Sequence, residues 1–95
     1  LAAQCADRSV TTIEGIARGG RLDALQHAFV DHGAVQCGFC IPGMIIAATA
    51  LLNETPHPTT EEIRTGLGGN LCRCSGYVKI VEPEAAAAAA AAAPA

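Results

Sequence analysis

Two close pairs of cysteines constrain what this chain can fold into more than any other feature of its sequence. Cys37 and Cys40 have two residues between them, and Cys72 and Cys74 have one. The stretch from residue 41 to residue 71, long enough to contain helices, separates the pairs. When folding brings two such pairs together, the chain can surround one metal centre with four thiolates. The spacing therefore predicts a fold built around a thiolate-bound metal centre.

The spacing of the second pair bears on which centre the thiolates hold. Zinc sites usually repeat C-x2-4-C twice, because each pair must open to a tetrahedral bite on one ion. A cluster of two irons and two sulfides is wider, with two thiolates on each iron, so pairs of unequal reach can grip it. The C-x-C pair therefore favours a 2Fe–2S cluster. A single zinc ion held by all four thiolates is the alternative.

Composition narrows the class of protein further. The 95 residues are 51% hydrophobic but only 3% aromatic, so small aliphatic side chains must build a light core that a metal centre would reinforce. The net charge of -3 gives no reason to expect a nucleic-acid partner. The apolar run from Met44 to Leu52 is too short to span a membrane. Five cysteines, an odd number, fit a reduced compartment, so we expect a cytoplasmic protein.

Hydrophobic periodicity predicts an all-α fold, a bundle of four short helices. A capping box of Thr59 and Glu62 marks the start of the third helix, and Pro83 should end the fourth. Tyr77, on the fourth helix, is predicted to be a core residue, since the chain has few other aromatic side chains. The predicted helices cover approximately residues 22–32, 41–53, 60–67 and 76–82.

The cysteine pairs fall where the second and fourth predicted helices begin. A 2Fe–2S cluster with four thiolates carries a net charge of about -2, and a helix N-terminus offers free amides and the positive end of the helix dipole. Glycines beside the cysteines would let the backbone approach the sulfurs closely. These glycines are Gly38, Gly43, Gly69 and Gly76. We therefore expect one 2Fe–2S cluster bound at helix N-termini.

Two longer motifs carry a resemblance to a known family. QCGFCIPGM at residues 36–44 and GNLCRCSGY at residues 69–77 closely resemble the helical iron–sulfur domain of molybdenum hydroxylases, the xanthine dehydrogenase, aldehyde oxidase and carbon monoxide dehydrogenase family. The resemblance covers nearly all of residues 5–82. It implies an electron-transfer subunit of an oxidoreductase complex, with no catalytic residue of its own. It also implies which residues ligate the 2Fe–2S cluster nearer the molybdenum cofactor. These ligands are Cys37, Cys40, Cys72 and Cys74.

The resemblance also implies a division of the chain. In the family, a plant-type ferredoxin half with a second 2Fe–2S cluster precedes the helical half. Residues 1–20 are then expected to be a linker left from a missing ferredoxin domain, residues 21–83 the helical cluster-binding domain, and residues 84–95 an alanine-rich, low-complexity tail. Cys5 stands where the last ligand of the second cluster lies in the family, so it would ligate that cluster only in a full-length chain.

Partners follow from the same resemblance. Electrons would pass from a molybdopterin-binding catalytic subunit, through the clusters, to an FAD-binding subunit or another acceptor. The resemblance implies that Gln36 and Cys74 contact the pterin. From the residues alone, Gln36 is more simply a polar side chain that satisfies backbone groups beside a helix. For the whole chain, the alternative is a four-cysteine zinc module that joins larger proteins.

Overall fold

The computed structural model describes residues 1–82 of the chain. Its α-helices are α1 (Ala24–Asp31), α2 (Ile41–Glu54) and α3 (Thr60–Gly66), and residues 78–82 are helical as well. The described part contains no strand, and its β-type pairing is limited to one isolated bridge between Arg18 and Arg21. The prediction of an all-α fold with four helices is confirmed. The predicted helix end at Pro83 and the predicted tail 84–95 lie outside the described residues.

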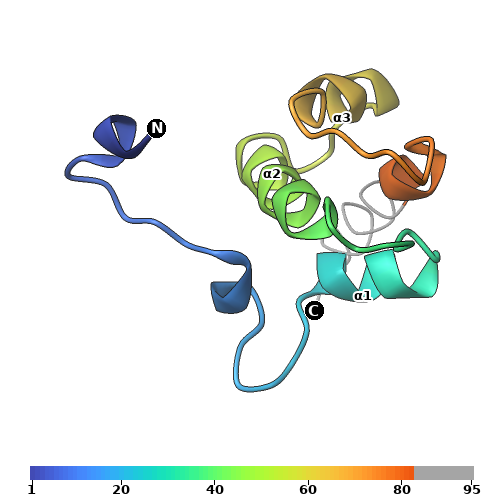
Figure 1. Cartoon of the computed structure of the whole chain (residues 1–95), viewed down its shortest axis with the longest axis horizontal. Coiled ribbons are helices and arrows are strands. Elements are labelled where there is room, and N and C mark those ends of the chain that lie inside the picture. Colours follow the sequence, from blue (N-terminus) through green and yellow to red (C-terminus); the bar gives the residue numbers. More distant parts are fainter. Residues whose placement is uncertain (83–95) are drawn as a thin grey trace.

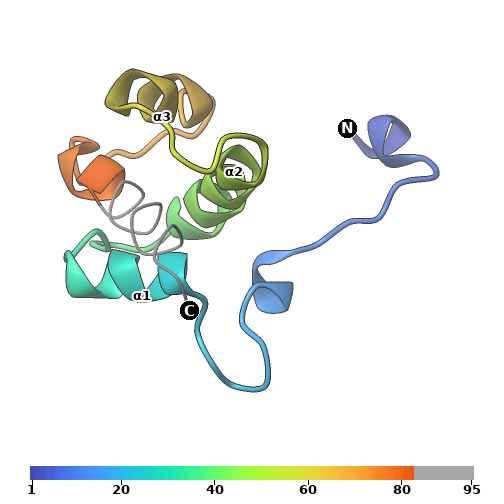
Figure 2. The same ribbon diagram turned by 180° about the vertical axis from the view of Figure 1, so that it is seen from behind.

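The helices form one body from which the N-terminal residues lead away (Figure 1). In this view and in the view from behind (Figure 2), the helical residues 78–82 lie between α1 and α3, opposite α2. Among the residues described, no helix combines the length and the apolar character that a membrane crossing requires.

Helix α1 begins where Asp23 caps it. The Asp23 carboxylate accepts a hydrogen bond from the Leu25 N–H at 3.3 Å, and the Asp23 N–H donates to the Gln26 side chain at 2.9 Å. This capping box satisfies amide groups that the first helical turn leaves without partners. The helix starts two residues later than the hydrophobic pattern indicated, because Leu22 precedes the cap and is exposed. Its inner face buries Leu25 and Phe29.

Helix α2 is the central element, and it contacts α1, α3 and the short 3-10 helix Ile13–Gly15. Cys40 is its N-cap residue, and Pro42 lies in the first turn, where a missing amide costs no hydrogen bond. Met44, Ile45 and Ala48 are buried at helical spacing. The end at Glu54 agrees with the turn that the sequence predicts there.

Helix α3 begins with the capping box predicted from the sequence. The Thr59 hydroxyl accepts from the Glu62 N–H at 3.2 Å, and the Thr59 N–H donates to the Glu62 carboxylate at 3.0 Å. Ile63 is fully buried against the core. At Gly66, a Cβ atom would come within 2.9 Å of Leu51 Cδ2, so the absence of a side chain lets α3 approach α2 closely.

A single core joins the helices. It consists of Leu25, Ala28, Phe29, Ala34, Met44, Ile45, Ala48, Ile63, Leu67 and Ile80. Two of the motif cysteines, Cys40 and Cys72, pack against it. The edge of the core therefore supports one cysteine from each motif.

The N-terminal residues lie mostly outside this core. Residues 1–12 are exposed, including the 3-10 helix Ala2–Cys5, and contact with the core begins at the half-buried Ile13 and Ile16. The division at residue 20 between a linker and a helical domain stays a prediction.

Replacing Ile63 with Ala should lower the free energy of unfolding by about 2 to 5 kcal/mol, because it empties a fully enclosed site between helices. Thermal denaturation followed by circular dichroism would measure the loss. The matched control is Val30→Ala in α1, where the side chain is 63% exposed and the change should be about 0.5 kcal/mol or less. Equal effects at the two positions would contradict the core described above.

Candidate metal centre

The first cysteine motif forms a turn that leads into α2. Gly38 has φ of +86°, a left-handed conformation that glycine adopts without strain, and its carbonyl accepts the Ile41 N–H at 3.4 Å. The turn places Cys37 at the surface and Cys40, half-buried, at the N-cap position of α2. As predicted, the first pair therefore lies at a helix N-terminus.

The second motif forms a closed loop of side-chain hydrogen bonds. The Ser75 N–H donates to Cys72 Sγ at 3.3 Å, and Ser75 Oγ lies 3.0 Å from the same sulfur. The Tyr77 N–H donates to Ser75 Oγ at 3.1 Å, and the Cys72 N–H donates to the Tyr77 hydroxyl at 2.9 Å. Gly76 and Tyr77 have φ of +67° and +73°, and these two left-handed residues turn the chain back on itself.

The second pair differs from the first in its relation to a helix. Helical structure resumes only at residue 78, so Cys72 and Cys74 lie in the preceding loop rather than in a first helical turn. The amide that reaches Cys72 belongs to Ser75, a loop residue. Loop geometry thus replaces the helix N-terminus predicted at this position.

The two motifs are held against each other where α2 begins. A Cβ atom at Gly43 would come within 3.0 Å of Asn70 Oδ1, two residues before Cys72. Gly43 therefore makes room for the second loop, which is a different purpose from the approach to sulfur predicted for it. Gly69, for which the same approach was predicted, has no atom within 4 Å of an added Cβ.

Folding pairs the thiols across the motifs. Cys37 lies near enough to Cys74 to raise its pKa, and Cys72 lies near enough to Cys40 to do the same. All four are free thiols, as is Cys5. Each contact thus joins one cysteine of the C-x2-C motif to one cysteine of the C-x-C motif.

The surroundings of the thiols change their acidity in different directions. The Ser75 hydroxyl, followed by the Ser75 amide, lowers the pKa of Cys72 to about 7. Burial raises the pKa of Cys40, and the neighbouring Cys72 adds to this effect. The Cys37 side chain raises the pKa of Cys74. The surroundings of Cys72 therefore favour its thiolate, the form that binds metal.

Neighbouring thiols in two pairs match what a centre with two metals requires. A zinc ion would need the four sulfurs to surround one point. Two neighbouring thiol pairs match the two thiolates that each iron of a 2Fe–2S cluster requires. The residues that could hold such a cluster are Cys37, Cys40, Cys72 and Cys74.

The two remaining predicted site residues, Gln36 and Cys5, lie in different parts of the structure. Gln36 is exposed and immediately precedes Cys37 in the chain, and Cys74 is exposed as well. Cys5 lies at the end of the 3-10 helix Ala2–Cys5, which stands apart from the helical body in Figure 1. The fold therefore brings together the four motif cysteines and leaves Cys5 out.

Three large apolar side chains next to the cysteines were not singled out from the sequence. Phe39 is 94% exposed between Cys37 and Cys40, and Leu71 is 82% exposed immediately before Cys72. Val35, two residues before Cys37, is exposed as well. We call Val35, Phe39 and Leu71 the apolar rim. For Phe39 a signal was available in the sequence, since a residue between two closely spaced metal ligands has little chance of reaching the core.

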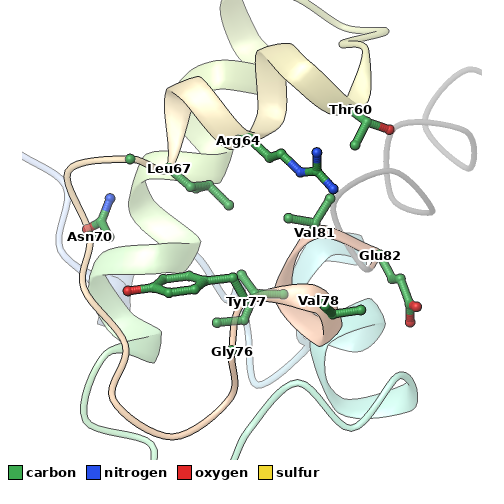
Figure 3. A pocket seen from close by; sticks show the side chains of 11 residues that line it. Thr60, Arg64, Leu67, Asn70, Gly76, Tyr77, Val78, Val81 and Glu82 are labelled. Carbon is green, nitrogen blue, oxygen red and sulfur yellow. The ribbon is translucent and has the colours of Figure 1, made fainter.

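Tyr77 also departs from its predicted role as a core residue. Its side chain is partly exposed and lines a groove of about 570 Å³ between α3 and the helical residues 78–82 (Figure 3). The hydroxyl reaches the loop at Cys72 instead of the core. The groove contains none of the cysteines, and its polar lining residues are Thr60, Arg64, Asn70 and Glu82.

Comparisons with known proteins agree with this geometry. A family model described as a 2Fe-2S binding domain matches residues 12–85. The nicotinate dehydrogenase small FeS subunit of Eubacterium barkeri is 52% identical over 80 residues, covering 84% of this chain and 51% of the relative. The xanthine dehydrogenase iron-sulfur-binding subunit of Escherichia coli O157:H7 is 54% identical over 84 residues, covering 85% of this chain and 52% of the relative.

Solved structures show the same fold. Quinoline 2-oxidoreductase from Pseudomonas putida 86 matches with a TM-score of 0.86 and 45% identity, over 96% of this chain and 57% of that one. The aldehyde oxidoreductase from Desulfovibrio desulfuricans ATCC 27774 matches with a TM-score of 0.84 and 48% identity, over 87% of this chain and 9% of that one. The chain spans about half the length of the small-subunit relatives. It belongs to the family of 2Fe-2S binding domains found in the iron–sulfur subunits of molybdenum hydroxylases of the xanthine dehydrogenase and aldehyde oxidase type.

Proposed function

We propose that the chain holds one 2Fe–2S cluster and carries electrons within a molybdenum hydroxylase complex. The observation that supports this most directly is the pairing of thiols across the two motifs, Cys37 with Cys74 and Cys40 with Cys72. When bound, such a cluster supplies one-electron redox chemistry. The protein's part is to fix the four sulfurs, to control access of water and to place hydrogen-bond donors at them.

The two thiol pairs have different surroundings, so the proposed centre has an inner side against the core and an outer side at the surface. Cys40 and Cys72 pack against the core, whereas Cys37 and Cys74 are exposed. Phe39 of the apolar rim lies between Cys37 and Cys40 in the chain and is 94% exposed, so a partner that covered it would gain free energy from its burial. We therefore propose that the molybdopterin-binding subunit docks on the face with Cys74 and Gln36, as the family resemblance implies.

The same proposal extends to the rest of the complex. The relatives are named for nicotinate and xanthine, yet they match this chain almost equally well, at 52% and 54% identity. We therefore assign the choice of substrate to the molybdopterin-binding catalytic subunit. An FAD-binding subunit, or another acceptor, would take the electrons. In a chain that also includes a ferredoxin-type half, Cys5 would ligate its cluster.

Each of the four motif cysteines should be required for the cluster. The wild-type chain should contain about two irons and two acid-labile sulfides, and Cys→Ser substitution at position 37, 40, 72 or 74 should remove most of both. Cys5→Ser is the matched control and should leave both unchanged, because Cys5 is exposed on the separate N-terminal 3-10 helix. One zinc per chain without sulfide would show the four-cysteine zinc module instead.

Enlarging Gly43 should loosen the cluster without unfolding α2. In Gly43→Val the new side chain would push against Asn70 and move the loop that leads to Cys72. We expect the visible absorption of the cluster to decay faster in the presence of a chelator, with helical circular dichroism retained. Gly69→Val is the control, because an added Cβ at that position meets no atom within 4 Å. Equal decay rates in the two variants would argue against this contact.

Gln36→Ala should slow reduction of the cluster by substrate, because electron transfer falls steeply when packing between the pterin and the cluster loosens. The cluster spectrum should stay the same, since glutamine is not a ligand. Stopped-flow reduction of the reconstituted complex would measure the rate, with the exposed His57→Ala as control. If both variants are reduced equally fast, the docking face proposed here is wrong, while the ligand assignment stands.

A further inference from the structure

The hydroxyl of Ser75 occupies a defined position in the second cysteine loop. Its oxygen accepts the Tyr77 N–H at 3.1 Å and lies 3.0 Å from Cys72 Sγ. The Ser75 N–H reaches the same sulfur at 3.3 Å. One residue thus places both a hydroxyl and an amide at one sulfur, and the left-handed turn at Gly76 and Tyr77 holds it there.

The direction of the hydroxyl bond follows from the chemistry of a ligand sulfur. A cysteine that binds metal is a thiolate, which has no proton to donate, so Cys72 can only accept. The Ser75 oxygen already accepts a bond from the Tyr77 amide, which leaves its own proton free for the sulfur. When Cys72 is a ligand, Ser75 therefore donates two hydrogen bonds to it.

Cys72 is distinguished by this contact from the other proposed ligands. Within the described residues, Cys72 is the one member of the four whose sulfur lies within hydrogen-bonding distance of a hydroxyl group. The exposed Cys37 and Cys74 side chains contact each other instead. The hydroxyl and amide of Ser75 therefore act on a sulfur of the pair that packs against the core. Ser75 itself is not one of the core residues.

We propose that Ser75 is a positioning residue that raises the reduction potential of the cluster through its two hydrogen bonds to Cys72 Sγ. The inference rests on the function proposed above. Reduction adds negative charge to the centre, and donors directed at a ligand sulfur stabilise the more negative form. Removing the hydroxyl leaves the amide bond in place, so the potential falls while the four thiolates remain.

Two matched pairs of variants isolate the hydroxyl. Wild type differs from Ser75→Ala in that group alone, and Ser75→Thr differs from Ser75→Val by a hydroxyl in place of a methyl group. The full chain would be loaded with its cluster, checked for iron and sulfide, and titrated with a redox dye series while EPR follows the reduced cluster. The expected result is a lower potential for Ala than for wild type and for Val than for Thr. Ser9→Ala, on the exposed N-terminal segment, should not change the potential.

The outcomes separate this inference from the proposed function. Equal potentials within both pairs, with the cluster intact, would overturn the role of Ser75 and leave the function standing. Loss of the cluster in both Ala and Val, with Thr loaded normally, would show that the hydroxyl is needed for assembly and would also overturn the proposal. A wild-type chain that holds no iron and sulfide would instead refute the proposed function.

Discussion

Four sulfurs from two distant loops must meet at the edge of a small core, and the rest of the structure depends on how this is achieved. Thiolates repel one another, so bringing them together without a cation is unfavourable. The Cys37 side chain raises the pKa of Cys74, and the pKa of Cys40 is raised first by burial and then by the neighbouring Cys72. The fold therefore holds the groups in place, and a bound cluster would supply the positive charge that makes their proximity favourable.

The core can bring the two motifs together only because the helices between them pack closely. Helix α2 begins at Cys40, and the chain returns through α3 to the loop at Cys72. Two glycines allow close approach along this path, Gly66 at Leu51 and Gly43 at Asn70. The side chains themselves bury little aromatic surface, so a cluster that ties the first loop to the second would add cohesion the core lacks. Metal binding and folding are thus expected to be coupled.

Local signals in the sequence predicted the helices well. The Thr59 and Glu62 capping box and the apolar spacing of α2 depend on residues close in sequence, and both appear as predicted. The motif spacing likewise singled out the four cysteines as ligands, an assignment that stays a prediction. The pairing of Cys37 with Cys74 could not be predicted in this way, because it depends on how two loops meet in space. Tyr77 was misplaced for a similar reason, since its left-handed backbone turns the ring away from the core and toward Cys72.

The proposed centre is asymmetric, and this asymmetry links the fold to its function. On one side, Cys40 and Cys72 lie against buried side chains, where the low polarity disfavours added negative charge. Ser75 offsets that effect at Cys72 with two donors. On the other side, Cys37 and Cys74 are exposed, so a partner could bring a redox group close to them while excluding water. In the proposed centre, the hydrogen bonds that tune the reduction potential therefore act on the inner pair. Electron transfer with the partner would take place at the outer pair. Changes at the docking face, such as those needed to fit different catalytic subunits, then need not alter the hydrogen bonds at Cys72.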